Sequence, residues 1–110
     1  MDKLKLLIII VDRKIADKVA ETATKQGAAY AHVLYGRGTA KNDLLNLLGI
    51  GETEKGIVLA AVNADAVEKI NSDVDYLYGL KKQGGGISFT IPMASVGGPA
   101  TLKILRGDKE

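Results

Sequence analysis

Two nearly continuous apolar segments dominate the hydrophobic pattern of the chain. The segments Leu4 to Val11 and Lys55 to Val62 each contain a single charged residue, a lysine. An apolar run without alternation predicts a central strand that is buried on both faces. The segment Ala29 to Tyr35 predicts another strand. A last strand is predicted where apolar residues alternate with small or polar ones, at Ile87, Phe89, Ile91 and Met93.

Helical spacing appears in the two segments that follow the continuous apolar runs. Asp12 can cap the first helix, and Gly27 follows its expected end. Asn63 or Asp65 can cap the second helix, and Gly79 ends it. The predicted buried stripes are Ile15, Ala16, Val19, Ala20 and Ala23 in the first helix, and Val67, Ile70, Val74 and Leu77 in the second.

The order of predicted elements is therefore βαββαβ. Right-handed crossovers around each helix place the first and third strands in the centre of the sheet and the other two at its edges. Pro92 fits an edge strand, which can leave a backbone position without a donor. We therefore expect an α+β, ferredoxin-like fold with a four-stranded antiparallel sheet, in which residues 1–110 form a single domain.

Composition excludes several classes of function. A net charge of +2 without a basic stripe argues against nucleic acid as a partner, and the absence of cysteine excludes disulfides and thiolate chemistry. The apolar run Leu6 to Val11 is too short to span a membrane, so we expect a cytoplasmic protein without direct membrane insertion. The single histidine, His32, has no partners at a spacing typical of a metal or catalytic site. The sequence thus predicts no catalytic residues and no metal ligands.

Glycine clusters are the strongest candidate binding elements. Backbone N–H groups in glycine loops can form concave anion sites. The competing interpretation is that these glycines are only connections between elements. If they bind a ligand, Gly86→Val should block its approach while the fold survives. The predicted ligand-binding residues are Gly36, Arg37, Gly38, Thr39, Lys55, Gly84, Gly85 and Gly86.

The long loop after the second predicted strand carries five aliphatic side chains. Contiguous exposed apolar surface usually marks an interaction site, so these side chains are predicted to bind a partner protein. The alternative is that they fold onto the protein's own core. They are Leu44, Leu45, Leu47, Leu48 and Ile50.

The order and spacing of these features resemble the PII signalling proteins of nitrogen regulation. The shared features are the Gly36-x-Gly38 turn, the long loop, Lys55 at the start of the third strand, and the glycine turn before Phe89. The resemblance covers most of the chain. It implies a non-enzymatic homotrimer that needs no cofactor and binds an adenine nucleotide as an effector in clefts between subunits. It also implies that the loop docks on a transporter or a metabolic enzyme.

The chain departs from the PII pattern where the family holds phosphate. Ile87 replaces a lysine, Gly98 and Ala100 replace two arginines, and the shortened loop has no tyrosine to be uridylylated. Each lost charge-assisted hydrogen bond costs roughly 1.5–3 kcal/mol. We therefore expect ADP or AMP rather than ATP as the effector. Two alternatives stay open, a CutA-like small trimeric metal-binding protein and a constitutive interaction module without a ligand.

Overall fold

A computed structural model gives the arrangement of the chain and describes residues 4–37, 54–82 and 85–98. Four strands and two α-helices follow one another in the described part, in the predicted order βαββαβ. A short 3-10 helix, η1, precedes the first α-helix. The elements are β1 (Leu4–Asp12), η1 (Arg13–Ile15), α1 (Ala16–Lys25), β2 (Ala31–Arg37), β3 (Glu54–Asn63), α3 (Ala64–Tyr78) and β4 (Ile87–Pro92).

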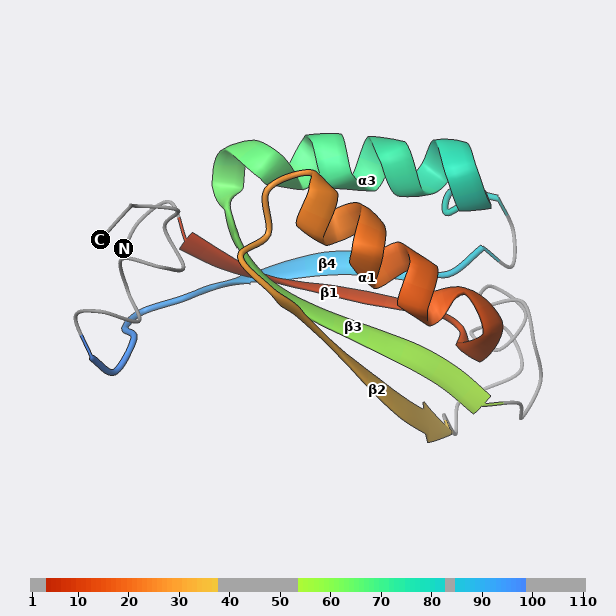
Figure 1. Ribbon diagram of the computed structural model, residues 1–110, viewed down its shortest axis with the longest axis horizontal. Coiled ribbons are helices and arrows are strands. Elements are labelled where there is room, and N and C mark those ends of the chain that lie inside the picture. Colours follow the sequence, from red (N-terminus) through yellow and green to blue (C-terminus); the bar gives the residue numbers. More distant parts are fainter. Residues whose placement is uncertain (1–3, 38–53, 83–84, 99–110) are drawn as a thin grey trace.

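The sheet has the strand order β2-β3-β1-β4, and every neighbouring pair is antiparallel. The predicted ferredoxin-like α+β fold is confirmed, with β1 and β3 central and β2 and β4 at the edges (Figure 1). Pro92 is the last residue of the edge strand β4, as its missing N–H group requires. The predicted second strand starts and ends two residues too early, because pairing with β3 begins at Ala31 and continues to Arg37.

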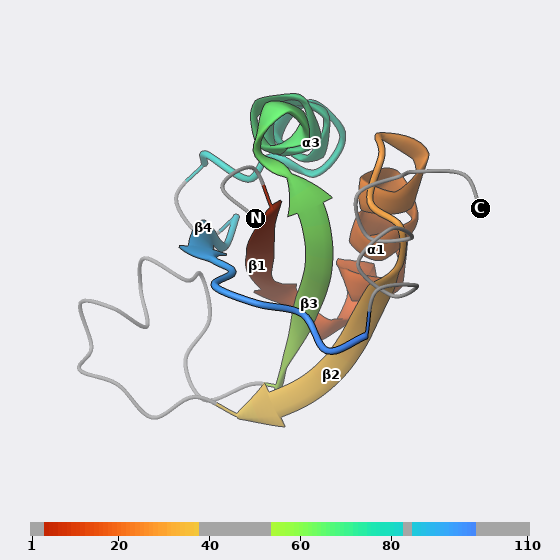
Figure 2. The same cartoon turned by 90° about the vertical axis from the view of Figure 1, so that its left-hand side faces the viewer.

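Both helices lie on one face of the twisted sheet, which we call the helix face (Figures 1 and 2). α1 packs on β2 and β3, α3 packs on β1 and β3, and the two helices contact each other. The largest side chains of this core are fully buried. They are Leu7, Ile9 and Val11 of β1, Val58 and Val62 of β3, Val19 of α1, and Ile70 and Val74 of α3.

The predicted helical stripes are correct except at one position. In α1 the stripe Ala16, Val19, Ala20 and Ala23 is buried, and Ile15 packs against it. Asp12 caps η1, because its carboxylate accepts a hydrogen bond from the Lys14 backbone N–H at 2.8 Å. Leu77 of α3 is 55% exposed, so its predicted burial is wrong. Four-residue spacing from Val74 brings Tyr78 onto the core instead.

The opposite face of the sheet, which we call the open face, is apolar, and neither α1 nor α3 lies over it (Figure 1). The register places β1 residues Leu6, Ile8 and Ile10 on it, together with side chains from the three other strands. β1 and β3 are therefore fully buried on one face and only half-buried along most of the other, unlike the prediction. Leu34, Phe89 and Ile91 at its margins are 50%, 43% and 46% exposed.

Candidate functional site

One end of the sheet brings together the predicted ligand-binding residues that the structure describes. β1 and β2 end there, β3 and β4 begin there, and the loop between β2 and β3 leaves from it (Figure 1). Gly36 pairs with Lys55, and Arg37 pairs with Glu54. Gly86 lies against the backbone of Ile10, near the end of β1. We call this region the loop end of the sheet.

A row of three residues crosses the open face at the loop end. Asp12 pairs with Lys55, and Lys55 pairs on its other side with Gly36, so all three positions share this face. Gly36 has no side chain, and a Cβ atom there would be in ordinary contact with Ile57 at 3.5 Å. The row therefore brings one carboxylate and one ammonium group beside a position without a side chain.

Lys55 is the buried charged residue of this row, with only 6% of its surface exposed. Burial lowers the pKa of its ammonium group below the usual value, because the charged form loses hydration, and the nearby Asp12 carboxylate raises the pKa in part. A partly dehydrated cation attracts an anion more strongly than one in bulk water does. Lys55 is thus well suited to hold an anionic group.

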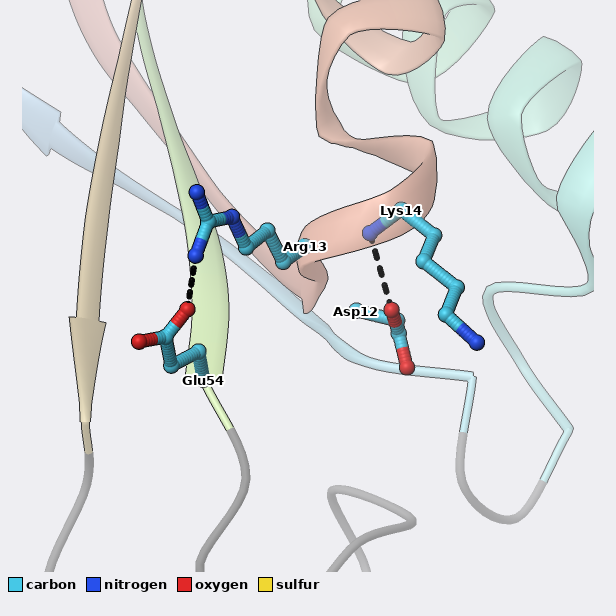
Figure 3. Close-up of polar contacts among 4 residues, drawn as sticks. All are labelled: Asp12, Arg13, Lys14 and Glu54. Carbon is cyan, nitrogen blue, oxygen red and sulfur yellow. Dashed lines mark hydrogen bonds and ion pairs between the residues drawn. The ribbon is translucent and has the colours of Figure 1, made fainter.

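A polar network on the helix side ties η1 to both strands that carry the loop. The Arg13 guanidinium donates to the Glu54 carboxylate, and the ion pair spans from η1 to the first residue of β3 (Figure 3). The same guanidinium lies 4.6 Å above the centre of the Tyr35 ring. The Tyr35 hydroxyl in turn lies 3.4 Å from the Asp17 carboxylate. The sequence prediction missed Arg13 and Glu54, although the polar triplet Asp12 to Lys14 directly after a buried strand indicates Arg13.

The glycines before β4 serve the fold itself. A side chain at Gly85 would collide with the carbonyl oxygen of Gly79, and one at Gly86 would collide with that of Ile10. Gly86 also has a φ of +123°, which other residues rarely adopt. The expectation that Gly86→Val would spare the fold is therefore wrong, because the substitution would break the contact between the turn and β1. The predicted contact of Gly85 and Gly86 with a ligand stays a prediction.

Several predicted residues lie outside the described part of the chain. These are Gly38, Thr39 and Gly84, and the apolar loop residues Leu44, Leu45, Leu47, Leu48 and Ile50. His32 is exposed on the edge strand β2, with its ring 5.0 Å from that of Tyr30. Within residues 4–37, 54–82 and 85–98, no group of three or more histidine, aspartate or glutamate residues is placed to hold a metal ion. In the same residues, no helix is long and apolar enough to cross a membrane.

Comparison with known proteins shows likeness in structure alone. No family model and no curated protein matches the chain. The divalent cation tolerance protein CutA1 of Thermus thermophilus is 18% identical and superimposes with a TM-score of 0.68, over 97% of this chain and 99% of its own. CutA1 of Pyrococcus horikoshii, also 18% identical, gives a TM-score of 0.68 over 92% of this chain and 93% of its own.

A PII-like protein is also among the similar structures. CPII of Thiomonas intermedia, described as a nitrogen regulatory PII-like protein bound to ADP, AMP and bicarbonate, is 18% identical to the chain. It has a TM-score of 0.66 over 87% of this chain and 94% of its own. The chain therefore has the fold that CutA and PII-like proteins share, and CutA proteins occur several times among the matches.

Proposed function

We propose that the chain is a non-enzymatic homotrimer that binds a small anionic effector at the loop end of its sheet. One observation carries this proposal. An apolar sheet face that neither α1 nor α3 covers borders a row in which the buried Lys55 pairs with Gly36. A contiguous apolar surface that is partly exposed is typical of a contact between subunits. The row of Asp12, Lys55 and Gly36 would then lie at the margin of that contact.

The trimer accounts for the composition of the open face. All four strands contribute apolar side chains to it, and Leu34, Phe89 and Ile91 would lose much of their exposed area against a sister subunit. Closed symmetric assembly also protects sheet edges from pairing with further chains. Three copies, rather than two, are proposed on the resemblance to the PII family.

The effector is proposed to be ADP or AMP. CPII is described as bound to ADP, AMP and bicarbonate, all of which are anions. Gly85 packs against the backbone of Gly79, and Gly86 packs against the backbone of Ile10. Because these glycines already contact the chain itself, we assign the anion to side-chain cations instead. Lys55 is the candidate on the open face at the loop end, and the exposed Arg37, which pairs with Glu54, is the candidate on the helix face. In this proposal, the five aliphatic loop residues dock on the regulated partner, a transporter or a metabolic enzyme.

A CutA-like function is the second candidate, and the structural likeness favours it over the PII-like one. CutA1 of Thermus thermophilus superimposes over nearly the whole of both chains, whereas CPII matches 87% of this chain. Binding of a divalent cation has no support from the described residues, which include no cluster of metal ligands. Calorimetric titration with Cu²⁺ and Zn²⁺ tests this candidate. Saturable binding of one ion per subunit would favour the CutA-like function over the proposal of an anionic effector.

Two measurements test the first candidate. Sedimentation equilibrium is expected to give three times the mass of the chain, and a monomer at micromolar concentration contradicts the trimer. Calorimetry is expected to show that ADP and AMP bind at least as tightly as ATP. Lys55→Gln should weaken ADP binding by about tenfold or more, equivalent to at least about 1.4 kcal/mol. Lys25→Gln on α1, which makes the same change of charge away from the site, is the control.

A further inference from the structure

An open groove lies between α3 and the beginning of β4, on the helix face of the sheet. In both views α3 runs above β4 (Figures 1 and 2). The groove has a volume of about 650 Å³. Its lining residues come from α3, from the turn after it and from β4, and they are Asn71, Leu80, Lys81, Lys82, Gly86, Ile87 and Ser88.

The groove exists because β4 turns its large side chains away from α3. Phe89 and Ile91 pair with Ile8 and Leu6, whose side chains lie on the open face. Ser88 pairs with Ile9 and therefore lies on the helix face, where its hydroxyl donates to the Asn71 side-chain oxygen at 2.7 Å. A small hydroxyl group thus occupies a position that an apolar side chain would have filled.

Hydrogen bonds fix the turn that forms one wall of this groove. α3 ends at Gly79, which adopts the left-handed conformation and donates to the Asp75 carbonyl at 2.8 Å. The Asp75 carboxylate accepts from the Lys81 N–H at 2.7 Å, and the Lys82 N–H donates to the Gly79 carbonyl at 3.1 Å. The backbone that carries both lysines is therefore held in place before a ligand arrives, which lowers the cost of binding.

The lining combines three kinds of chemistry. Leu80 is buried and offers apolar surface, whereas Ile87 pairs with Ile10, directs its side chain to the open face and lines the groove with its backbone. Asn71 and Ser88 form a hydrogen-bonded polar pair, with the amide nitrogen of Asn71 as a further donor. Lys81 and Lys82 are exposed at the rim, and the nearest acid of the turn, Asp75, is engaged with the Lys81 backbone. Apolar surface beside two ammonium groups suits an anion with an apolar body.

We propose that this groove is a second binding site, within one subunit, for a small organic anion. An aromatic or aliphatic body lies against Leu80, and the carboxylate or phosphate faces Lys81 and Lys82. Asn71 and Ser88 contact polar atoms of the body. The groove shares no residue with the row of Asp12, Lys55 and Gly36, although Gly86 is also one of the predicted ligand-binding residues.

The test is a titration of the ¹⁵N-labelled full chain with phenyl phosphate, followed by NMR. Saturable shifts centred on the amides of Lys81, Lys82, Ile87 and Ser88 are expected. Phenol should bind at least about tenfold more weakly, since it lacks the charge that the lysines contact. Benzoate in place of phenyl phosphate distinguishes the two anionic groups, and the tighter of the two identifies the preferred class. Phenol binding as tightly as both anions overturns the proposal.

Variants separate the groove from general attraction to a basic protein. The double variant Lys81→Gln with Lys82→Gln should weaken phenyl phosphate by about tenfold or more, equivalent to at least about 1.4 kcal/mol. The matched control, Lys18→Gln with Lys25→Gln on the exposed side of α1, should change the affinity less than about twofold. Equal losses in both pairs, or no saturable shift at millimolar ligand, overturn the proposal.

AMP in the same titration distinguishes this inference from the proposed function. Shifts of Arg37 and Lys55 with AMP, but none in the groove with phenyl phosphate, would support the effector site and overturn the groove. Groove shifts with phenyl phosphate, but none at Arg37 or Lys55 with AMP, would support the groove and count against the nucleotide effector.

Discussion

The two faces of the sheet have similar sequences and different surroundings. In β1 the three consecutive isoleucines Ile8, Ile9 and Ile10 differ only in the face on which they lie. Ile9 is fully buried under the helices, whereas Ile8 and Ile10 are half-buried on the open face. An apolar face that neither α1 nor α3 covers is expected to gain another cover in water. In the proposed trimer, part of the hydrophobic pattern would therefore specify assembly rather than the fold of one chain.

The largest expected effect separates the two faces at neighbouring positions. Ile9→Ala should lower the free energy of unfolding by about 2–5 kcal/mol at every protein concentration, because it leaves a cavity in the helix-face core. Ile8→Ala, the matched control, should lose stability mainly through assembly, so its loss should change with concentration. Urea denaturation at two protein concentrations measures both. A concentration-independent loss of the same size in Ile8→Ala would mean that both faces are core of a single chain.

The second prediction concerns the open face alone. Phe89→Ser removes a ring that is 43% exposed, so it should weaken self-association by about tenfold to a hundredfold, or about 1.4–2.7 kcal/mol. Sedimentation velocity over a dilution series measures the change. Tyr76→Ser, at a side chain that is 88% exposed on α3, is the control and should leave self-association unchanged. If the Tyr76 variant dissociates instead, the interface lies on the helices.

The third prediction compares two glycines near the loop end. A methyl group at Gly56 would collide with the Ala16 side chain on the helix face, so Gly56→Ala should cost about 1–3 kcal/mol of stability. A methyl group at Gly36 would lie 3.5 Å from Ile57, an ordinary contact, and Gly36→Ala should change stability by less than about 0.5 kcal/mol. Thermal melting of both variants tests the pair. Equal losses would contradict the difference in packing between the two faces.

The smallest expected effect comes from Lys55 and depends on pH. Since burial lowers the pKa of Lys55 in the folded state, the unfolded chain binds more protons between the lowered and the usual value. The contribution of Lys55 to stability should therefore rise as the pH is raised through that window towards the usual pKa of 10.5. Lys55→Met should remove this rise. Urea denaturation from neutral to alkaline pH compares the two proteins, and parallel profiles would show that Lys55 is not the group responsible.

Most of the fold could be predicted because the signals for it are local. The apolar runs of β1 and β3, the cap at Asp12 and the edge proline Pro92 each act within a few residues. The central strands, the cap and the edge position are confirmed, although β1 and β3 are not buried on both faces. The errors occur where a neighbouring element decides. Leu77 fits the helical spacing, but the core below α3 favours Tyr78, and periodicity alone does not locate that core.

The candidate site was less predictable because its residues meet only through strand pairing. Lys55 and Gly36 were predicted as ligand-binding residues from the glycine pattern, but their partner Asp12 was predicted only as a cap. The Arg13–Glu54 ion pair joins residues that are 41 positions apart, a distance at which no local pattern operates. The alternation of β4 was recognised, yet the face to which Phe89 points depends on its register with β1.

The proline at the end of β4 limits how the sheet can grow. The Met93 N–H donates inward to the Leu4 carbonyl, so by alternation Pro92 directs its backbone nitrogen to the outer edge. A strand added there would find no donor at that position. Unlimited edge-to-edge association of copies requires that both edge strands can pair, and the β4 edge lacks one backbone donor. Pro92 therefore makes this edge a poorer template for pairing with a strand of another copy.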